Sequence, residues 1–138
     1  ILVCLVGSEM CIRDSRTPHD VMKLIINSEK NGCKVFIAAA GMAAHLAGAV
    51  AAHSIKPVIG IPIESGGMGG IDSLLSTAMM PPGVPVATVA VGKSGAKNSA
   101  ILAVQILATA DEELSQKLKD YKKNMRDEVL EKDKNLNS

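Results

Sequence analysis

Three short segments combine glycines with polar side chains, and each stands between an apolar run and an expected helix. They are residues 40–45, 64–72 and 92–95. Glycines let a ligand approach the backbone closely, and the amides at the start of a helix favour an anion. None of the three matches the dinucleotide or phosphate-loop signatures. Their spacing alone therefore predicts a small anionic ligand and nothing more specific.

Three side chains in these segments are candidates for chemistry. His45 is expected about one turn into its helix, where it could transfer a proton or serve as a hydrogen-bonded core histidine. Lys93 could contact a phosphate, although a solvated loop lysine fits the pattern equally well. Asp72 is expected to cap a short helix rather than to act as a catalytic acid.

Alternating strands and helices must position these residues. Continuous apolar strands of this kind predict a parallel sheet covered on both faces, with the ligand site beyond the carboxyl ends of the strands. The final helix carries an apolar stripe of Leu114, Leu118, Tyr121, Met125 and Val129. The strands are expected at 35–39, 58–62 and 84–91, and the helices from Pro18 to about 31, at 42–53, 73–78 and 97–108, and at 111–131 before a frayed tail.

Composition excludes several classes of function. The 138 residues favour one domain, and the net charge of +1 gives no general attraction to nucleic acid or anionic membrane. Phe36 and Tyr121 are the only aromatic residues, too few for a base-stacking platform. The uncharged run 35–55 is rich in alanine and contains glycine and histidine, so a buried strand and helix are expected there rather than a membrane span.

The cysteines predict no metal or disulfide framework. Cys4, Cys11 and Cys33 have neither zinc-site nor disulfide-scaffold spacing. Reduced thiols in a cytoplasmic protein are therefore expected.

The first fifteen residues look foreign. Residues 5–15 read LVGSEMCIRDS, which resembles the translation of a transposase sequencing adapter. We assign residues 1–4 to the same segment and set both aside before interpreting the fold. The expected native part is residues 16–138, a fragment whose first strands are missing.

The remaining sequence resembles a known enzyme family, the class I N5-carboxyaminoimidazole ribonucleotide mutases, also called the phosphoribosylaminoimidazole carboxylase catalytic subunit. The similarity runs from Arg16 to about Leu130 through several long motifs in the same order. It is carried by Arg-Thr-Pro at 16–18, Gly-Met-Ala-Ala-His-Leu at 41–46, and segments 57–62, 70–76, 80–81, 83–92 and 105–108, with Ala96 and Asn98.

The resemblance implies a three-layer α/β/α fold of the flavodoxin/Rossmann-like type, in a homo-octamer whose C-terminal helix, residues 111–131, packs on neighbours. It implies a step of purine biosynthesis in which a carboxylate moves from the exocyclic nitrogen of an imidazole ribonucleotide to ring carbon C4. It implies neither cofactor nor metal. Since the family is thought to release and recapture carbon dioxide, a small, dry, closed pocket is expected.

Site residues carry over in part. Arg16 matches the arginine that holds the substrate phosphate. Ser15 stands where the family has its main acid/base histidine, so the chain as written is expected to be inactive. Ala47 stands where the family usually has proline, and Pro82 stands where it usually has arginine. The loop expected to surround the imidazole and carboxylate comprises Ala40, Gly41, Ala43, His45 and Leu46.

Two other functions are compatible with the fold. One is the class II carboxylase, which uses carbon dioxide directly, and the other is a non-catalytic nucleotide-binding α/β module. The sequence follows class I at the His45 loop and at the strand before Gly92, and the density of motif matches disfavours the module.

Overall fold

A computed structural model of the chain describes residues 2–4 and 17–136. The chain divides into two compact units, Ile1–Ala103 and Val104–Ser138. The first unit contains the sheet and all the loops singled out above.

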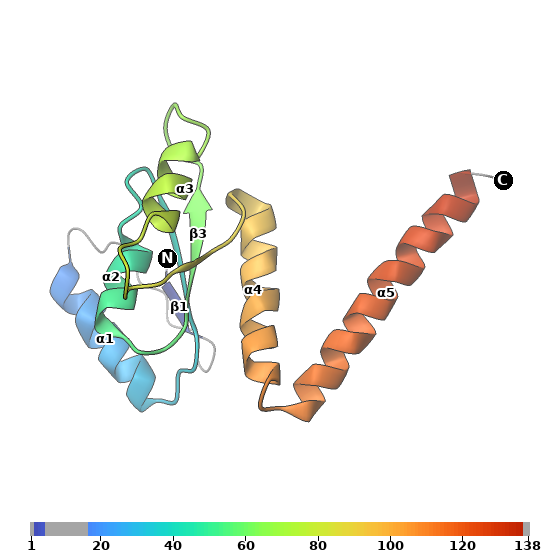
Figure 1. The fold of residues 1–138 in the computed structure, drawn as a ribbon, viewed down its shortest axis with the longest axis horizontal. Helices are drawn as coiled ribbons and strands as arrows, with labels where there is room; N and C mark the ends of the chain where they lie inside the picture. The colour runs from blue at the N-terminus through green and yellow to red at the C-terminus, as the bar shows by residue number, and fades with distance from the viewer. Residues whose placement is uncertain (1, 5–16, 137–138) are drawn as a thin grey trace. The chain divides into compact units, whose positions relative to one another are not determined.

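The sheet has four strands in the order β1-β2-β3-β4. Figure 1 labels β1 and β3. β2 (Phe36–Gly41), β3 (Val58–Ile63) and β4 (Ala87–Thr88) run parallel, as predicted. β1 (Leu2–Cys4) pairs with β2 in the antiparallel direction. This strand departs from the predicted all-parallel sheet, and it lies in the segment that we expect to be foreign.

One face of the sheet is covered by α1 (Pro18–Lys30) and α2 (Leu46–His53) (Figure 1). Alternate residues of β2 point into this layer because side chains of a strand alternate between its faces. Phe36 and Ala38 are fully or almost fully buried there, in the main apolar cluster. The helices contribute Val21, Ile25, Leu46, Ala47 and Val50 to the same cluster.

β3 shows that helices lie on both faces. At Gly60 a Cβ atom would meet Ala47 of α2 and Thr77 of α3 (Ile71–Ala78), so these two helices share a face. Ile61 points the other way, and its Cγ2 would lie 3.3 Å from a Cβ at Gly95, near the start of α4 (Gly92–Ala108). The first unit is therefore a three-layer α/β/α arrangement, as expected.

Three element boundaries differ from the prediction. α2 begins at Leu46 instead of Met42, because Met42 has a left-handed φ of 57° that a right-handed helix cannot include. The strand expected at 84–91 is reduced to β4, where Pro85 removes a ladder donor and only Val89 N extends the pairing, to Gly60 O at 3.1 Å. α4 begins at Gly92, so Lys93 lies in its first turn rather than in a loop.

Two further expectations are corrected. Asp72 is not the cap of α3: the N-cap is Gly70, with a left-handed φ of 82°, and Asp72 lies inside the first turn. Cys33 is disulfide-bonded, against the expectation of reduced thiols. The other two cysteines of the chain, Cys4 and Cys11, both belong to the segment that we expect to be foreign.

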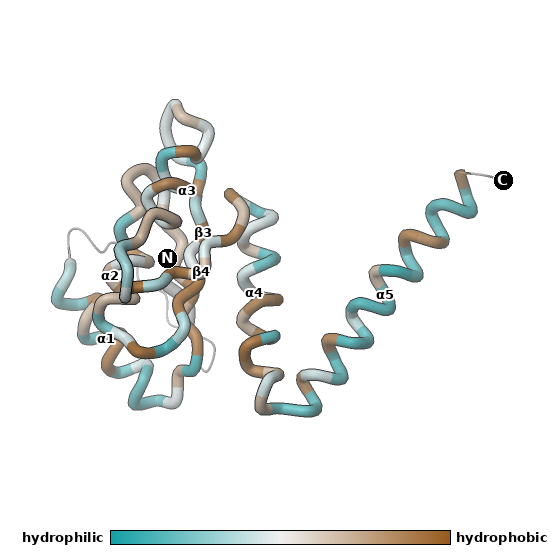
Figure 2. The backbone as a smooth tube through the Cα atoms, in the orientation of Figure 1, coloured by the Kyte–Doolittle hydropathy of each residue, from teal (hydrophilic) through white to brown (hydrophobic). Residues whose placement is uncertain are grey.

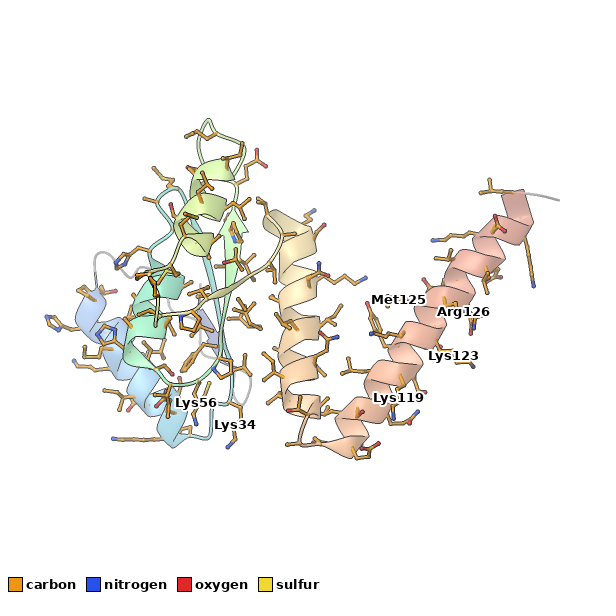
Figure 3. The ribbon with its side chains drawn as sticks, viewed as in Figure 1. Lys34, Lys56, Lys119, Lys123, Met125 and Arg126 are labelled. Atoms are coloured by element: carbon orange, nitrogen blue, oxygen red, sulfur yellow. The ribbon has the colours of Figure 1, made fainter. Side chains whose placement is uncertain are left out.

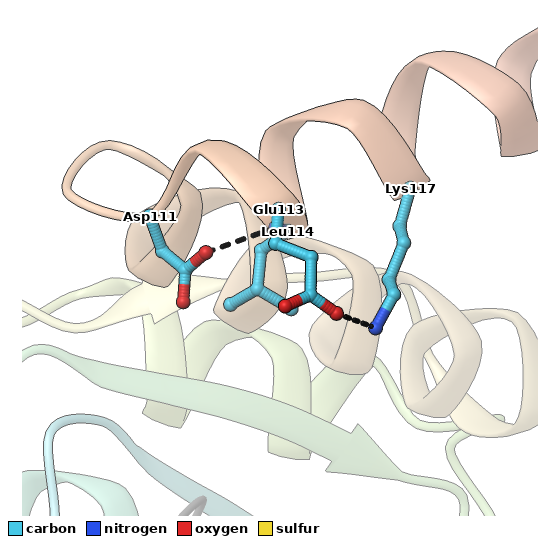
Figure 4. Close-up of polar contacts among 4 residues, drawn as sticks. All are labelled: Asp111, Glu113, Leu114 and Lys117. Atoms are coloured by element: carbon cyan, nitrogen blue, oxygen red, sulfur yellow. Dashed lines mark hydrogen bonds and ion pairs between the residues drawn. The ribbon is translucent and has the colours of Figure 1, made fainter.

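The second unit contains the end of α4 and α5 (Glu112–Leu136), whose helix continues through the tail that was expected to fray. Asp111 caps α5, since its Oδ1 accepts a hydrogen bond from Leu114 N at 3.0 Å (Figure 4). None of the α5 residues described is buried, and Figure 2 shows isolated apolar stretches along a largely hydrophilic helix. Lys119, Lys123 and Arg126 extend from its exposed surface (Figure 3).

An ion pair on the first turns of α5 supports a prediction about titration. Lys117 Nζ lies 2.6 Å from Glu113 Oε1, and this hydrogen bond, with the charge of Glu113, raises the pKa of Lys117 above 10.5 (Figure 4). Glu113→Gln is expected to lower that pKa toward 10.5, as measured by NMR titration of the lysine side chains. A Lys117 pKa unchanged by Glu113→Gln, or lowered equally by Glu128→Gln, would contradict the pairing.

The pair also sets a direction for stability. Because the pKa of Lys117 is raised in the folded state, the stabilisation of the fold by its pair with Glu113 is fully present below about pH 10.5. That stabilisation is lost as the pH rises through the folded pKa of Lys117.

The packing of α4 on the sheet predicts the effect of a single methyl group. A Cβ at Gly95 would collide with the backbone carbonyl oxygen of Ala90, which cannot rotate away as a side chain could. Gly95→Ala is expected to lower the free energy of unfolding by about 1–3 kcal/mol, measured by urea denaturation. Gly67→Ala is the control, since nothing lies within 4 Å of its added methyl. Equal stability of the Gly95→Ala and Gly67→Ala variants would contradict the close approach of Gly95 to the Ala90 carbonyl oxygen.

Candidate functional site

The carboxyl ends of β2 and β3 bring two loops together. Gly41 and Ile63 are paired at the last position of the two parallel strands. A Cβ at Gly41 would collide with the Ser65 side chain, and it would lie 3.1 Å from Ile63 O. Gly41 is therefore required where loop 42–45 meets loop 64–70.

Loop 42–45 is short and tightly constrained. Met42 is the one non-glycine residue with a positive φ in the part of the chain described, and its carbonyl accepts a hydrogen bond from Ala44 N at 2.9 Å. His45 is the N-cap of α2, and its carbonyl accepts the first helical bond, from Ala49 N at 3.0 Å. His45 therefore lies at the junction of loop and helix, not one turn into the helix as predicted. His45 is exposed to solvent.

A groove runs along α2 from this loop. It has a volume of about 470 Å³ and lies between α2 and the segment at the end of α3. A smaller hollow of about 110 Å³ lies on the α1 side of α2, and His45, Ala49 and His53 contribute to both. The wall of the larger groove is mostly small and apolar: Ala43, Ala44, His45, Gly48, Ala49, Ala52, His53, Ser76, Met80, Pro81 and Val84.

His53 is a groove residue that the sequence interpretation assigned no role. Its Nδ1 lies 2.8 Å from Ala49 O, and because a carbonyl only accepts, Nδ1 carries the proton. In the neutral ring Nε2 is then the acceptor. Helical spacing was the signal that could have found it, since His45, Ala49 and His53 are four residues apart on one face.

The predicted site residues separate into three groups. Ala43 and His45 line the groove. Ala40 and Gly41 are half-buried at the end of β2, and Leu46 is 4% exposed in the core. Ser15 and Arg16 lie outside the described residues, so their predicted positions are untested.

The remaining candidates do not line the groove. Lys93 and Pro82 are exposed, and Ala47 is buried against the sheet. Asp72 Oδ1 and Thr88 Oγ1 are shielded from solvent and have no hydrogen-bond partner within the described structure.

Residues 2–4 and 17–136 contain neither a candidate metal site nor a candidate membrane span. No group of three or more His, Cys, Asp or Glu side chains there could hold a metal ion. None of the helices described is both long enough and apolar enough to cross a membrane.

Comparison with known proteins decides the family. The AIR carboxylase family profile matches residues 8–128. The chain belongs to the AIR carboxylase family. The matched range includes residues 8–15, part of the segment that we expect to be adapter-derived, and that expectation stays a prediction.

Individual relatives in this family carry a more specific name. The Escherichia coli K12 protein named N5-carboxyaminoimidazole ribonucleotide mutase is 52% identical over 116 residues, which are 84% of this chain and 69% of the relative. Mutases of the same name from Saccharolobus solfataricus and Bacillus subtilis are 52% and 48% identical over 115 and 116 residues. These matches cover 83% and 84% of this chain and 72% of each relative.

The left-handed Met42 predicts an asymmetric response to substitution. Met42→Gly is expected to change the free energy of unfolding by less than about 1 kcal/mol, because glycine adopts this φ without strain. Met42→Val is expected to cost about 1–3 kcal/mol, because a β-branched residue is strained there. Urea denaturation measures both, with Met68→Val as the control at an exposed methionine without a positive φ. Similar losses for the two valine variants would contradict a strained loop.

Proposed function

We propose that this protein, in its native form, converts N5-carboxyaminoimidazole ribonucleotide into 4-carboxy-5-aminoimidazole ribonucleotide in purine biosynthesis. The observation that carries the proposal is the loop 41–46, which sets His45 at the head of α2 and in a groove lined by small residues. Membership of the AIR carboxylase family and about 50% identity to proteins named mutases support the same reaction.

The reaction moves one carboxylate within the substrate. The bond from the exocyclic nitrogen to the carboxyl carbon breaks, and a bond from C4 to that carbon forms. The nitrogen gains a proton and C4 loses one, so a group that both donates and accepts a proton is needed. No redox change occurs, and we propose no cofactor or metal.

We assign roles to the loop residues accordingly. His45 binds the substrate and assists proton transfer or stabilises developing charge. Ala40, Gly41, Ala43 and Leu46 surround the imidazole and the carboxylate, where alanine and glycine allow a close, water-poor fit around released carbon dioxide. A guanidinium provides the forked donors that suit a phosphate, the role that we propose for Arg16.

The N-terminus is part of the proposal. We propose that residues 1–15 are adapter-derived, that residues 16–138 are the catalytic-domain fragment, and that Ser15 replaces the acid/base histidine. The chain as written would then be inactive. We further propose that the native enzyme is cytoplasmic and forms a homo-octamer, in which the apolar stripe of α5 contacts neighbours.

The test restores the missing segment. Residues 1–15 are replaced by the corresponding N-terminal part of the E. coli relative, up to and including its histidine, and carboxylate transfer is followed spectrophotometrically. The restored chimera is expected to turn over and the chain as written is not. His45→Asn in the chimera is expected to lower the rate about 10²–10⁴-fold, because a proton-transfer or charge-stabilising group is lost.

One control variant and two contradicting outcomes complete this experiment. His19→Asn, at an exposed histidine of α1 that lines neither hollow, is expected to leave the rate within a few-fold of the chimera. Turnover by the chain as written would refute the proposed loss of the acid/base group. A chimera that folds, by circular dichroism, but shows no turnover would refute the proposed activity.

A further inference from the structure

The segment proposed to surround the substrate carboxylate has few hydrogen-bond donors among its side chains. Between Ala40 and Leu46, His45 is the one polar side chain, because the other residues are alanine, glycine, methionine and leucine. A carboxylate has two oxygens, and its removal from water is costly unless they are hydrogen-bonded. Any second side-chain donor must therefore come from a neighbouring segment.

Loop 64–70 is the segment that adjoins this one. It joins the end of β3 to α3 (Figure 1), and Gly41 and Ile63 are paired where β2 and β3 end. The two loops touch at Ser65, whose Oγ and Cβ would both overlap with a Cβ atom at Gly41. Ser65 is therefore the side chain of loop 64–70 that lies against the backbone of the carboxylate segment.

The base of loop 64–70 is closed by a buried serine. Ser73 is 0% exposed, and its Oγ lies 3.0 Å from Ile63 O and 2.9 Å from Gly70 O. One hydroxyl thus contacts carbonyl oxygens at both ends of the loop. Ser65 follows the anchored Ile63 by two residues, so it is held beside the carboxyl ends of the strands, where ligands of parallel sheets bind.

The Ser65 hydroxyl has the chemistry that a carboxylate requires. The side chain is half-buried, and no hydrogen bond joins its hydroxyl to another residue in the part of the chain that the structure describes. The neighbouring Glu64 is exposed, and an ionised carboxylate only accepts hydrogen bonds. The rest of loop 64–70 consists of glycine and methionine. Ser65 therefore carries the one side chain of this loop that can donate a hydrogen bond to an anion.

We propose that Ser65 is a substrate-binding residue whose hydroxyl donates a hydrogen bond to the carboxylate of the bound imidazole ribonucleotide. The inference rests on the proposed function, because that reaction supplies the carboxylated ligand. His45 and Ser65 then provide one polar side chain from each of the two loops that meet at Gly41. Ser65 distinguishes the carboxylated ribonucleotide from one without a carboxylate, because its hydrogen bond is made to that group alone.

Isothermal titration calorimetry on the restored chimera tests this contact with two ligands. One is 4-carboxy-5-aminoimidazole ribonucleotide, and the other is 5-aminoimidazole ribonucleotide, the same molecule without the carboxylate. Ser65→Ala is expected to weaken binding of the carboxylated ligand about 10–100-fold, as for a hydrogen bond to a charged group, and to leave binding of the other ligand within about 2-fold. Ser65→Cys keeps the size of the side chain but is a weak donor, so it is expected to act in the same direction.

Ser115→Ala, at a half-buried serine of α5, is the matched control and should bind both ligands like the unmodified chimera. Circular dichroism checks that each variant folds. Equal weakening of both ligands by the two Ser65 variants, or unchanged binding of both, would overturn the proposal. A chimera that binds neither ligand refutes the proposed function on which the inference rests. An active chimera whose Ser65 variants keep full affinity for the carboxylated ligand refutes the Ser65 contact alone.

Discussion

The parallel pairing of β2 with β3 is the constraint on which the rest of the structure depends. The register from Phe36↔Val58 to Gly41↔Ile63 makes the two strands end together, so the loops that follow them must meet. The contact of Gly41 with Ser65 is possible only without a side chain at Gly41. From that point the chain has four residues in which to turn into α2, and the left-handed Met42 makes the turn possible. The position of His45 follows from this geometry.

The fold class, the start of α1 and the loops at the strand ends were predictable from the pattern of apolar residues, prolines and glycines. Continuous apolar strands separated by helical segments gave the parallel α/β class, and Pro18 correctly marked the start of α1. The loops beyond the strand ends were also identified, because glycines cluster there. Motifs shared with a known family pointed to the same segments and to His45.

Other features depend on contacts that a pattern does not contain. Because a left-handed methionine is rare, the alanine-rich run predicts a helix from Met42 onward. The helix instead begins at Leu46. Asp72 is a residue type typical of a helix N-cap, yet the N-cap of α3 is Gly70, two residues earlier. The orientation of α3 was not predictable, because Ser73 and Thr77 satisfy their hydroxyls within their own helix and can be buried at little cost. The antiparallel β1 comes from a segment that we expect not to belong to the enzyme.

The proposed chemistry and the proposed role of Ser65 both concern the retention of the carboxylate in the site. A carboxylate that leaves nitrogen and reappears on carbon must not be lost to water. Capture of the same carboxylate is therefore the central claim. It is tested by giving the restored chimera substrate labelled with ¹³C in its carboxylate, in unlabelled bicarbonate buffer, and analysing the product by mass spectrometry. Retention of the label at C4 is the predicted result, whereas a product carrying unlabelled carboxylate would show that carbon comes from solution and would contradict the mutase assignment.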